Sequence, residues 1–421
     1  MRTPTPATGL SREATGQITL RELVGERAFL LYLIGQMTSG AGSALSSVAL
    51  VFAVLSISHS ASSVGLVLLS SRLPGIALTL AGGVIADRWP RKWIAVWADG
   101  TRTALQLITG ILLLTGHATV PDLAALQFIS GGASALFAPA AGALLAGVAP
   151  RGQIRRASSL LGITTSAMQT GGLAVSGLLV ALAGPGTSLL IDGATFAAST
   201  TTLALIPAEV RARPRAGGAL TDLREGWRAV TRHRWLMISS SRETVVNVLA
   251  LSPFFVLGPV IAKDHLGGAP AWSAIALGYV IGNLVAAHIT YHWAPRRPIL
   301  AALLVSTALI PMLALIGVAA PLWAIIPAAL LAGAETTIYN TLSTATLQAN
   351  LPAERLGRAS AISGIGSTLL VPVGMGLAGV AAGAIGTSTV MLSGAALVLI
   401  TAVICLALPA TYTPLRLDRQ D

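Results

Sequence analysis

Long apolar stretches dominate the chain and recur about twelve times. Each is near the ~20 residues that an α-helix needs to cross the ~30 Å hydrocarbon layer of a membrane. Short polar segments separate them, and the sequence lacks the alternating pattern of a β-barrel. It predicts an all-α polytopic membrane protein with twelve transmembrane helices, at about 28–57, 62–86, 93–115, 121–148, 158–183, 187–206, 235–262, 270–292, 298–319, 321–348, 358–383 and 387–408.

The longest polar interruption, 207–234, divides these spans six and six. It begins with a Pro, Arg and Gly-rich stretch and continues with Leu220, Leu223, Trp227 and Val230 at helical spacing. We expect an amphipathic helix at the cytosolic membrane surface, with a partner-binding segment as the alternative. The expected parts are a cytosolic N-terminal tail (1–27), a six-helix bundle (28–206), this linker, a second six-helix bundle (235–408) and a cytosolic C-terminal tail (409–421).

The two sets of spans repeat each other at an offset of 202 residues. Pro150 is followed by Arg156-Ala157-Ser158, and Pro352 is followed at the same distance by Arg358-Ala359-Ser360. Several glycines after these triplets also coincide. We therefore expect two pseudo-symmetric halves of like orientation, with a binding site near the midplane between them.

Positive charge is distributed unevenly between the two sides of the predicted spans. Of the 27 basic residues, 23 lie in segments on one alternate side, one (Lys263) lies on the other, and three lie inside spans. Because cytoplasmic loops carry the excess of Lys and Arg, both termini are expected in the cytoplasm. The excess of Arg (25) over Lys (2) indicates a GC-rich bacterial genome, and hence a bacterial inner cell membrane.

Composition excludes several classes of protein. With 54% hydrophobic and 10% charged residues, the chain has too little polar surface for a soluble globule. The net charge of +11 is dispersed over many segments, which favours lipid headgroups over nucleic acid as its partner. Cys405 is the single cysteine and the histidines lack ligand spacing, so neither a disulfide framework nor a metal site is expected.

The segment Gly82-Gly83-Val84-Ile85-Ala86-Asp87-Arg88-Trp89-Pro90-Arg91-Lys92 resembles the signature loop of the major facilitator superfamily. Asp99 with Arg102, the stretch 190–196 and the exit of the tenth span add a resemblance to its drug and siderophore exporter branch, the transmembrane secretion effectors. Two departures stand out, since Trp89-Pro90 replaces the usual loop glycine and Leu173 replaces the proline of the exporters' fifth-span motif. The resemblance implies a twelve-helix carrier that works by alternating access.

The same resemblance implies a cytosolic gate that latches the two halves together in the outward-open state. Its expected residues are Gly83, Asp87, Arg88, Arg91, Lys92 and Arg358. A helix end can supply N–H groups to Asp87, and Arg358 can pair with it. The alternative is an ordinary solvated turn.

Charges inside the predicted spans are the strongest candidates for mechanism, because each costs ~2.5 to 3.5 kcal/mol to insert. Arg72, Glu243 and Glu335 lie near mid-bilayer, and Asp192 lies nearer the outer end of its span. Burial favours a neutral carboxyl and a nearby arginine favours a charged one, so a carboxyl that gains and loses an arginine can carry a proton. We expect these four residues to couple proton and substrate, with static interhelical contacts as the alternative. The resemblance places spans one, four, seven and ten, and hence Glu243 and Glu335, around the central cavity.

Other polar residues within spans have more ordinary alternatives. Arg72 requires an anionic or carbonyl partner, either on a facing helix or on the substrate. Asp99 and Arg102 are three residues apart and favour a structural pair on one helix face. A last set of uncharged side chains can bind substrate in the cavity or join helices, namely Gln36, Ser39, Gln127, Asn247 and Asn340.

These features predict a monomeric secondary transporter that exports an amphipathic drug, antibiotic or siderophore-like compound in exchange for protons. Its partners are the small-molecule substrate, protons and the lipid bilayer, and no cofactor is expected. An uptake carrier is the alternative, followed by a membrane subunit of an ATP-driven assembly or a receptor. The sequence contains neither a GxxxxGK[ST] nucleotide loop nor HExxH or GxSxG, so we expect no enzyme.

Overall fold

The computed structural model describes residues 25–81, 90–150, 153–207, 231, 233–293, 295–351 and 370–412. These residues form helices and short turns, and no strand occurs among them. Eight of the described helices have the length and hydropathy to cross a membrane, and Ala61–Ile76 and Val371–Ile385 are shorter apolar helices. Large apolar side chains such as Trp323 and Val380 remain exposed, as contact with hydrocarbon requires. The predicted all-α membrane class is confirmed.

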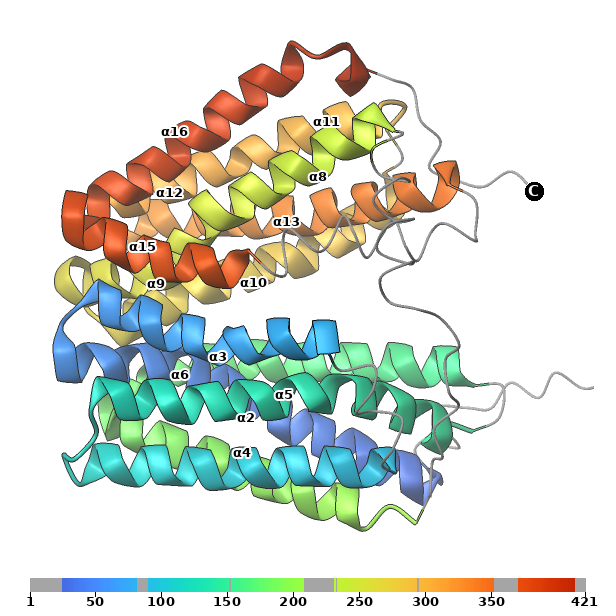
Figure 1. Cartoon of the computed structure of the whole chain (residues 1–421). Coiled ribbons are helices and arrows are strands. Elements are labelled where there is room, and N and C mark those ends of the chain that lie inside the picture. Colours follow the sequence, from blue (N-terminus) through green and yellow to red (C-terminus); the bar gives the residue numbers. More distant parts are fainter. Residues whose placement is uncertain are drawn as a thin grey trace, which may run out of the picture.

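The first group of helices runs back and forth in a bundle (Figure 1). It contains α2 (Arg27–Ser58), α3 (Ala61–Ala81), α4 (Arg91–Leu114), α5 (Val120–Val148) and α6 (Ile154–Ala204). The 51-residue α6 is interrupted at Gly184, whose φ of 81° is open to glycine and strained for other residues. Pro185 follows and starts the return segment. The chain thus reverses direction at the place where the sequence predicts a boundary between two spans.

The second group forms a separate bundle above the first in Figure 1. It contains α8 (Arg234–Val246), η1 (Asn247–Leu251), α9 (Ser252–Ile261), η2 (Ala262–Leu266), α10 (Ala269–His292), α11 (Pro298–Val305), η3 (Ser306–Ala308), α12 (Leu309–Gly317), α13 (Leu322–Asn350), α15 (Val371–Ile385), α16 (Thr387–Leu406) and η4 (Pro409–Tyr412). From α8 to η2 the chain is one continuous helical rod. Its η1 segment is a π-helix, a local widening that often marks a functional site.

Helix starts carry their own local signals. At the start of α5 the Thr119 backbone N–H donates to Asp122 Oδ2 (3.1 Å), and the Asp122 N–H donates to Thr119 Oγ1 (3.3 Å). This capping box satisfies two N–H groups that the first helical turn leaves free. Pro121 adds a residue whose fixed φ suits the first turn.

The two ends of the bundles differ in charge. We call one the basic end, since Arg27, Arg91, Arg156 and Arg297 lie there at or beside helix termini, and the opposite one the far end. Within the described residues, the hydrogen bonds that join the two groups lie toward the far end. They are Ser62 Oγ to Gly379 O (2.8 Å), Ser176 Oγ with Ser273 Oγ (3.1 Å) and Lys263 Nζ to Leu55 O (2.5 Å). These hydrogen bonds therefore hold the two groups in contact at the far end.

A cavity of about 2740 Å³ lies between the two groups. Its wall runs from Val51 and Trp272 in the interior to Arg91 and Gly147 at the basic end. Helices α2, α3, α4, α5 and α6 line it from the first group, and η1, α9, α10 and α15 from the second. The fold thus builds a chamber that is closed at the far end and reaches the basic end.

Some expectations fall outside the described residues. Gate residues Gly83, Asp87, Arg88 and Arg358 belong to this set, as do most of both expected tails and nearly all of the expected linker helix.

Candidate functional site

An aromatic cluster covers the cavity wall that the second group provides. The ring centroids of Phe254 and Trp272 are 5.1 Å apart, and those of Phe254 and Phe255 are 4.9 Å apart. Tyr279 extends the cluster, with its ring 5.8 Å from that of Phe254. Helices α9 and α10 supply these four side chains, and all four line the cavity. The wall therefore suits an apolar or aromatic compound.

Polar groups reach the cavity at only a few points. Asn247 lies on the π-helix η1 and lines the cavity, as expected. Arg72, on α3, lines the cavity and is exposed to it. Arg91 lies at the basic end of the lining. Among the described lining residues, Arg72 and Arg91 carry the charge, and none is Asp or Glu.

Glu335 is buried in α13, with 5% of its surface exposed, and is not among the described cavity-lining residues. Thr336 Oγ1 donates to Glu335 Oε2 (3.1 Å), and the Tyr279 hydroxyl is 2.8 Å from Thr336 Oγ1. Because Tyr279 lines the cavity, a chain of two hydrogen bonds leads from the cavity to the carboxylate. Helices α10 and α13 approach closely here, because Gly333 packs directly on the Tyr279 carbonyl. This close approach brings the Tyr279 hydroxyl within reach of Thr336. This chain of hydrogen bonds was not predicted from the sequence.

Arg242 and Glu243 lie beside the same carboxylate. Arg242 is 7% exposed, and its Nε and Nη2 atoms have no hydrogen-bond partner. Glu335 is within electrostatic reach of both Arg242 and Glu243. Arg242 nevertheless forms no ion pair shorter than 4.0 Å with either acid. Within the described residues such a pair occurs between Asp99 and Arg102. We call Glu243, Glu335 and Arg242 the acidic cluster of the second group. Its arginine is buried with two N–H donors that lack hydrogen-bond partners.

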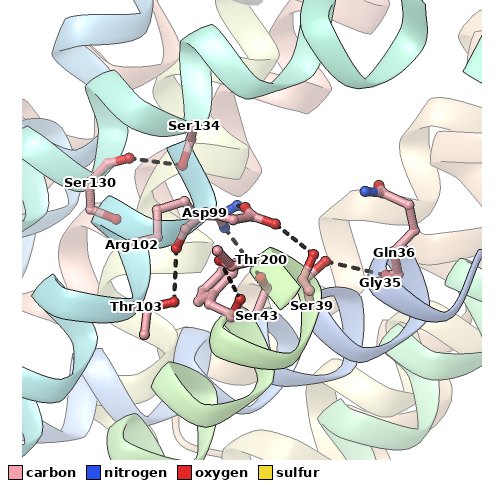
Figure 2. Close-up of polar contacts among 12 residues, drawn as sticks. Gly35, Gln36, Ser39, Ser43, Asp99, Arg102, Thr103, Ser130, Ser134 and Thr200 are labelled. Carbon is pink, nitrogen blue, oxygen red and sulfur yellow. Dashed lines mark hydrogen bonds and ion pairs between the residues drawn. The ribbon is translucent and has the colours of Figure 1, made fainter. Parts of the chain in front are cut away.

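Asp99 and Arg102 form the predicted pair in α4 (Figure 2). Asp99 is fully buried and accepts hydrogen bonds from Arg102 Nη1 (3.3 Å) and Ser199 Oγ (2.6 Å). Arg102 also donates to Ser43 Oγ (3.4 Å) and stacks 3.7 Å over the Phe196 ring. The pair therefore ties α4 to α2 and α6.

Asp192 is fully buried in α6 and is also well bonded. Gln106 Nε2 donates to Asp192 Oδ2 (2.5 Å), and Thr195 Oγ1 donates to Oδ1 (3.4 Å). Gln127 donates in turn to Gln106 Oε1 (3.5 Å), which connects α5, α4 and α6. None of these residues is among the described lining of the cavity. We call Asp99, Arg102, Gln106 and Asp192 the acidic cluster of the first group.

Four of the uncharged polar residues lie away from this cavity, and Gln127 takes the alternative role of joining helices. Gln127 does not reach the cavity, because its amide turns toward Gln106. Asn340 is exposed and is not among the described lining residues of either cavity. Gln36 and Ser39 line a different cavity of about 350 Å³ between α2, α5 and α6, where Gln36 Nε2 is buried without a partner.

Lys92 contacts its own group of helices. Its Nζ donates to the Ile206 carbonyl (2.6 Å), just beyond the end of α6, and lies 5.2 Å from the Trp93 ring centroid. This conformation thus shows Lys92 joining α4 to α6 and leaves its part in a gate as a prediction.

No three His, Cys, Asp or Glu side chains gather at metal-binding distance within the described ranges. The chemistry that the described site offers is binding of an apolar body, charge pairing at Arg72 and proton exchange at a carboxylate.

Residues 24–414 match the model of the family described as transmembrane secretion effector. Macrolide efflux protein A of Streptococcus pyogenes is 24% identical over 388 residues, which cover 88% of this chain and 93% of that protein. The MFS-type transporter YkuC of Bacillus subtilis (strain 168) is 23% identical over 299 residues, or 66% of this chain and 69% of YkuC.

Solved structures share the fold at low sequence identity. A bacterial homologue of the iron transporter ferroportin, in an inward-facing state, superposes with a TM-score of 0.73 at 15% identity, covering 92% of this chain and 99% of that one. The nucleoside transporter NupG gives 0.70 at 15% identity, covering 90% and 98%. These relatives and structures are transporters.

Proposed function

The chain belongs to the transmembrane secretion effector family of major facilitator transporters, and on this premise we propose that it exports an amphipathic organic compound in exchange for protons. The observation that carries the proposal is the hydrogen-bond chain from the cavity to buried Glu335, through Tyr279 and Thr336. It connects a chamber of substrate size to a group that can hold a proton.

We infer twelve transmembrane helices in two bundles, 28–206 and 235–408. Eight described helices qualify by length and hydropathy alone, and α6 is long enough for two spans around its break at Gly184. Helix α4 has membrane length but carries Arg91, Lys92, Asp99 and Arg102, which lower its hydropathy. The short α3 and α15 complete the set.

Alternating access follows from how the bundles meet. At the far end the bundles meet through closely packed small residues, such as Gly177 on the Ala269 carbonyl, and through a few hydrogen bonds, such as that between the Ser176 and Ser273 hydroxyls. We expect these surfaces to separate and meet again as the bundles rock. If the basic end faces the cytoplasm, as the positive-inside rule predicts, the cavity of this conformation faces inward. Loading from the cytoplasm is what an exporter in the cell membrane requires.

Glu335 is the proposed proton carrier, with Glu243 and Arg242 beside it. When the carboxylate is charged it can draw the Arg242 guanidinium, whose free N–H groups lack acceptors. When it is protonated that attraction is lost. A change of protonation can therefore move α8 relative to α13.

Transport into liposomes tests the proposal. The purified chain, without ATP, is given dansyl amphipaths of negative, neutral and positive charge under an imposed pH gradient. Exchange with protons predicts that at least one probe accumulates in the acidic compartment. Protein-free liposomes and a protonophore provide the controls.

The direction of movement separates the alternatives. Accumulation in the alkaline compartment indicates proton-coupled uptake, and the absence of gradient-driven movement for every probe contradicts both carriers.

A further inference from the structure

We propose that the cavity binds amphipathic organic anions and that Arg72 receives the negative group. This rests on the proposed export function, because it names the class of compound that the same cavity carries. It also decides between the two partners that the sequence leaves open for Arg72, a carboxylate on a facing helix or the substrate itself.

Arg72 lies near the middle of the membrane. It is the twelfth residue of α3, so it is about 17 Å along a helix that rises 1.5 Å per residue. The neighbouring Ser71 carbonyl packs on Gly131, which holds this part of α3 against α5. Arg72 itself is exposed to the cavity and makes no hydrogen bond or ion pair with the described residues.

An arginine in this position remains charged. Its guanidinium does not lose its proton in proteins, and a charge at this depth is costly without a partner. No acidic side chain is among the described lining residues, so this part of the cavity wall offers Arg72 no carboxylate. A carboxylate, sulfonate or phosphate on the substrate matches the guanidinium fork.

The other charged side chain of the described lining has the same sign. Arg91 lies at the basic end of the lining, between the entrance and Arg72. A cleft lined by one sign of charge concentrates ions of the opposite sign and repels like ions. The cavity therefore favours anions over cations from its mouth inward.

The apolar part of the ligand has a separate place. Phe254, Phe255 and Trp272 belong to the second group of helices, whereas Arg72 belongs to the first. An amphipathic anion can pair with Arg72 and lay its apolar body on the aromatic wall, so it contacts both groups. The proton site at Glu335 lies on the second group, apart from the residue that receives the substrate charge.

Binding to the purified full chain in nanodiscs tests the proposal. Three dansyl probes share one apolar body and end in a carboxylate, a primary amide or a trimethylammonium group. Trp97 and Trp272 line the cavity, so energy transfer from tryptophan to dansyl reports binding. The carboxylate probe should bind about tenfold more tightly than the ammonium probe, a difference of ~1.4 kcal/mol.

Substitutions locate the source of that preference. Arg72→Gln should weaken binding of the carboxylate probe about tenfold and binding of the amide probe less than twofold. Arg72→Lys should retain most of the preference for the carboxylate probe over the ammonium probe. Arg155→Gln removes the same charge from an exposed residue outside the described lining, and should leave all three affinities unchanged. Retained binding of the amide probe shows that each variant is folded.

Three results would overturn the proposal. They are ammonium binding as tight as carboxylate binding, equal losses in Arg72→Gln and Arg155→Gln, and equal losses for the carboxylate and amide probes in Arg72→Gln. Anion binding without gradient-driven transport would instead contradict the proposed exchange and leave this inference standing. Gradient-driven transport of the ammonium probe alone would contradict this inference, but the proposed exchange with protons would still hold.

Discussion

The two groups of helices bury their acids in different surroundings. In the first group, Asp99 and Asp192 each accept hydrogen bonds from two side chains, and Asp99 has an arginine at 3.3 Å. In the second group, Glu335 accepts one side-chain hydrogen bond, while Arg242 leaves two N–H donors unused. Both carboxylate oxygens of each acid thus accept hydrogen bonds in the first group, where Arg102 leaves Nε without a partner. In the second group one oxygen of Glu335 does so.

This difference indicates which acids can change protonation at little structural cost. A proton added to Asp99 would disturb contacts that join α4 to α6, since both carboxylate oxygens are in use. A proton added to Glu335 removes one accepted hydrogen bond at most, and the Tyr279 hydroxyl connects it with the cavity. We therefore assign a structural role to the first cluster and proton coupling to the second.

The largest expected effect is that of Glu335→Gln. Glutamine keeps the shape of the glutamate side chain and can accept a hydrogen bond from Thr336, but it cannot release a proton. Gradient-driven transport should therefore fall on the order of 100-fold or more. Probe binding and thermal stability should be retained. Proteoliposome transport checks this, and full pH-dependent transport in both Glu335→Gln and Glu243→Gln would refute the assignment.

Asp99→Ala should act on stability. It leaves the Arg102 guanidinium without its carboxylate inside the bundle, which should cost about 3 kcal/mol of unfolding free energy. The melting temperature in detergent measures it. Asp122→Ala removes an exposed acid from a helix cap and should cost only about 1 kcal/mol. Equal losses in the two variants would argue against a structural role for the buried pair.

Tyr279→Phe should produce an intermediate effect. The variant keeps the aromatic wall but breaks the hydrogen-bond chain, so proton-driven transport should slow about 3- to 10-fold, as expected for one neutral hydrogen bond. The matched control is Tyr412→Phe, whose hydroxyl donates to the Leu406 carbonyl (3.0 Å), outside the chain. Transport slowed as much by the control as by Tyr279→Phe would exclude the chain as the route.

Gln127→Leu should have the smallest effect. Its hydrogen bond to Gln106 is 3.5 Å long, at the limit of such contacts, so the loss of stability should be below about 1 kcal/mol. Transport rates and melting temperature check this. A transport loss comparable with that of Glu335→Gln would indicate that residues of the first group also take part in proton coupling, contrary to the structural role assigned to them.

Much of the fold could be predicted, because hydrophobicity along a span is a local property. The expected span 121–148 and the observed α5 (Val120–Val148) nearly coincide, and the boundary expected near 184 is the break at Gly184. The local widening at Asn247 was not predicted, since a π-helix depends on how α8 and α9 pack.

The site was predicted only in part. Intramembrane charge singles out Arg72 and Glu335 because insertion is costly, and spacing of three residues identifies Asp99 with Arg102. Gln106 could have been added, since it follows Arg102 by four residues on the same helix face. Tyr279 and Thr336 could not, because 57 residues separate them and only packing brings them together.

Proton release on ligand binding tests the central claim most directly. Purified protein in weakly buffered detergent solution, with a pH-sensitive dye, is mixed with the dansyl probe that binds most tightly. The account predicts that the wild type and Asp192→Asn release protons, whereas Glu335→Gln binds the probe without release. Release that persists in Glu335→Gln and disappears in Asp192→Asn would contradict it.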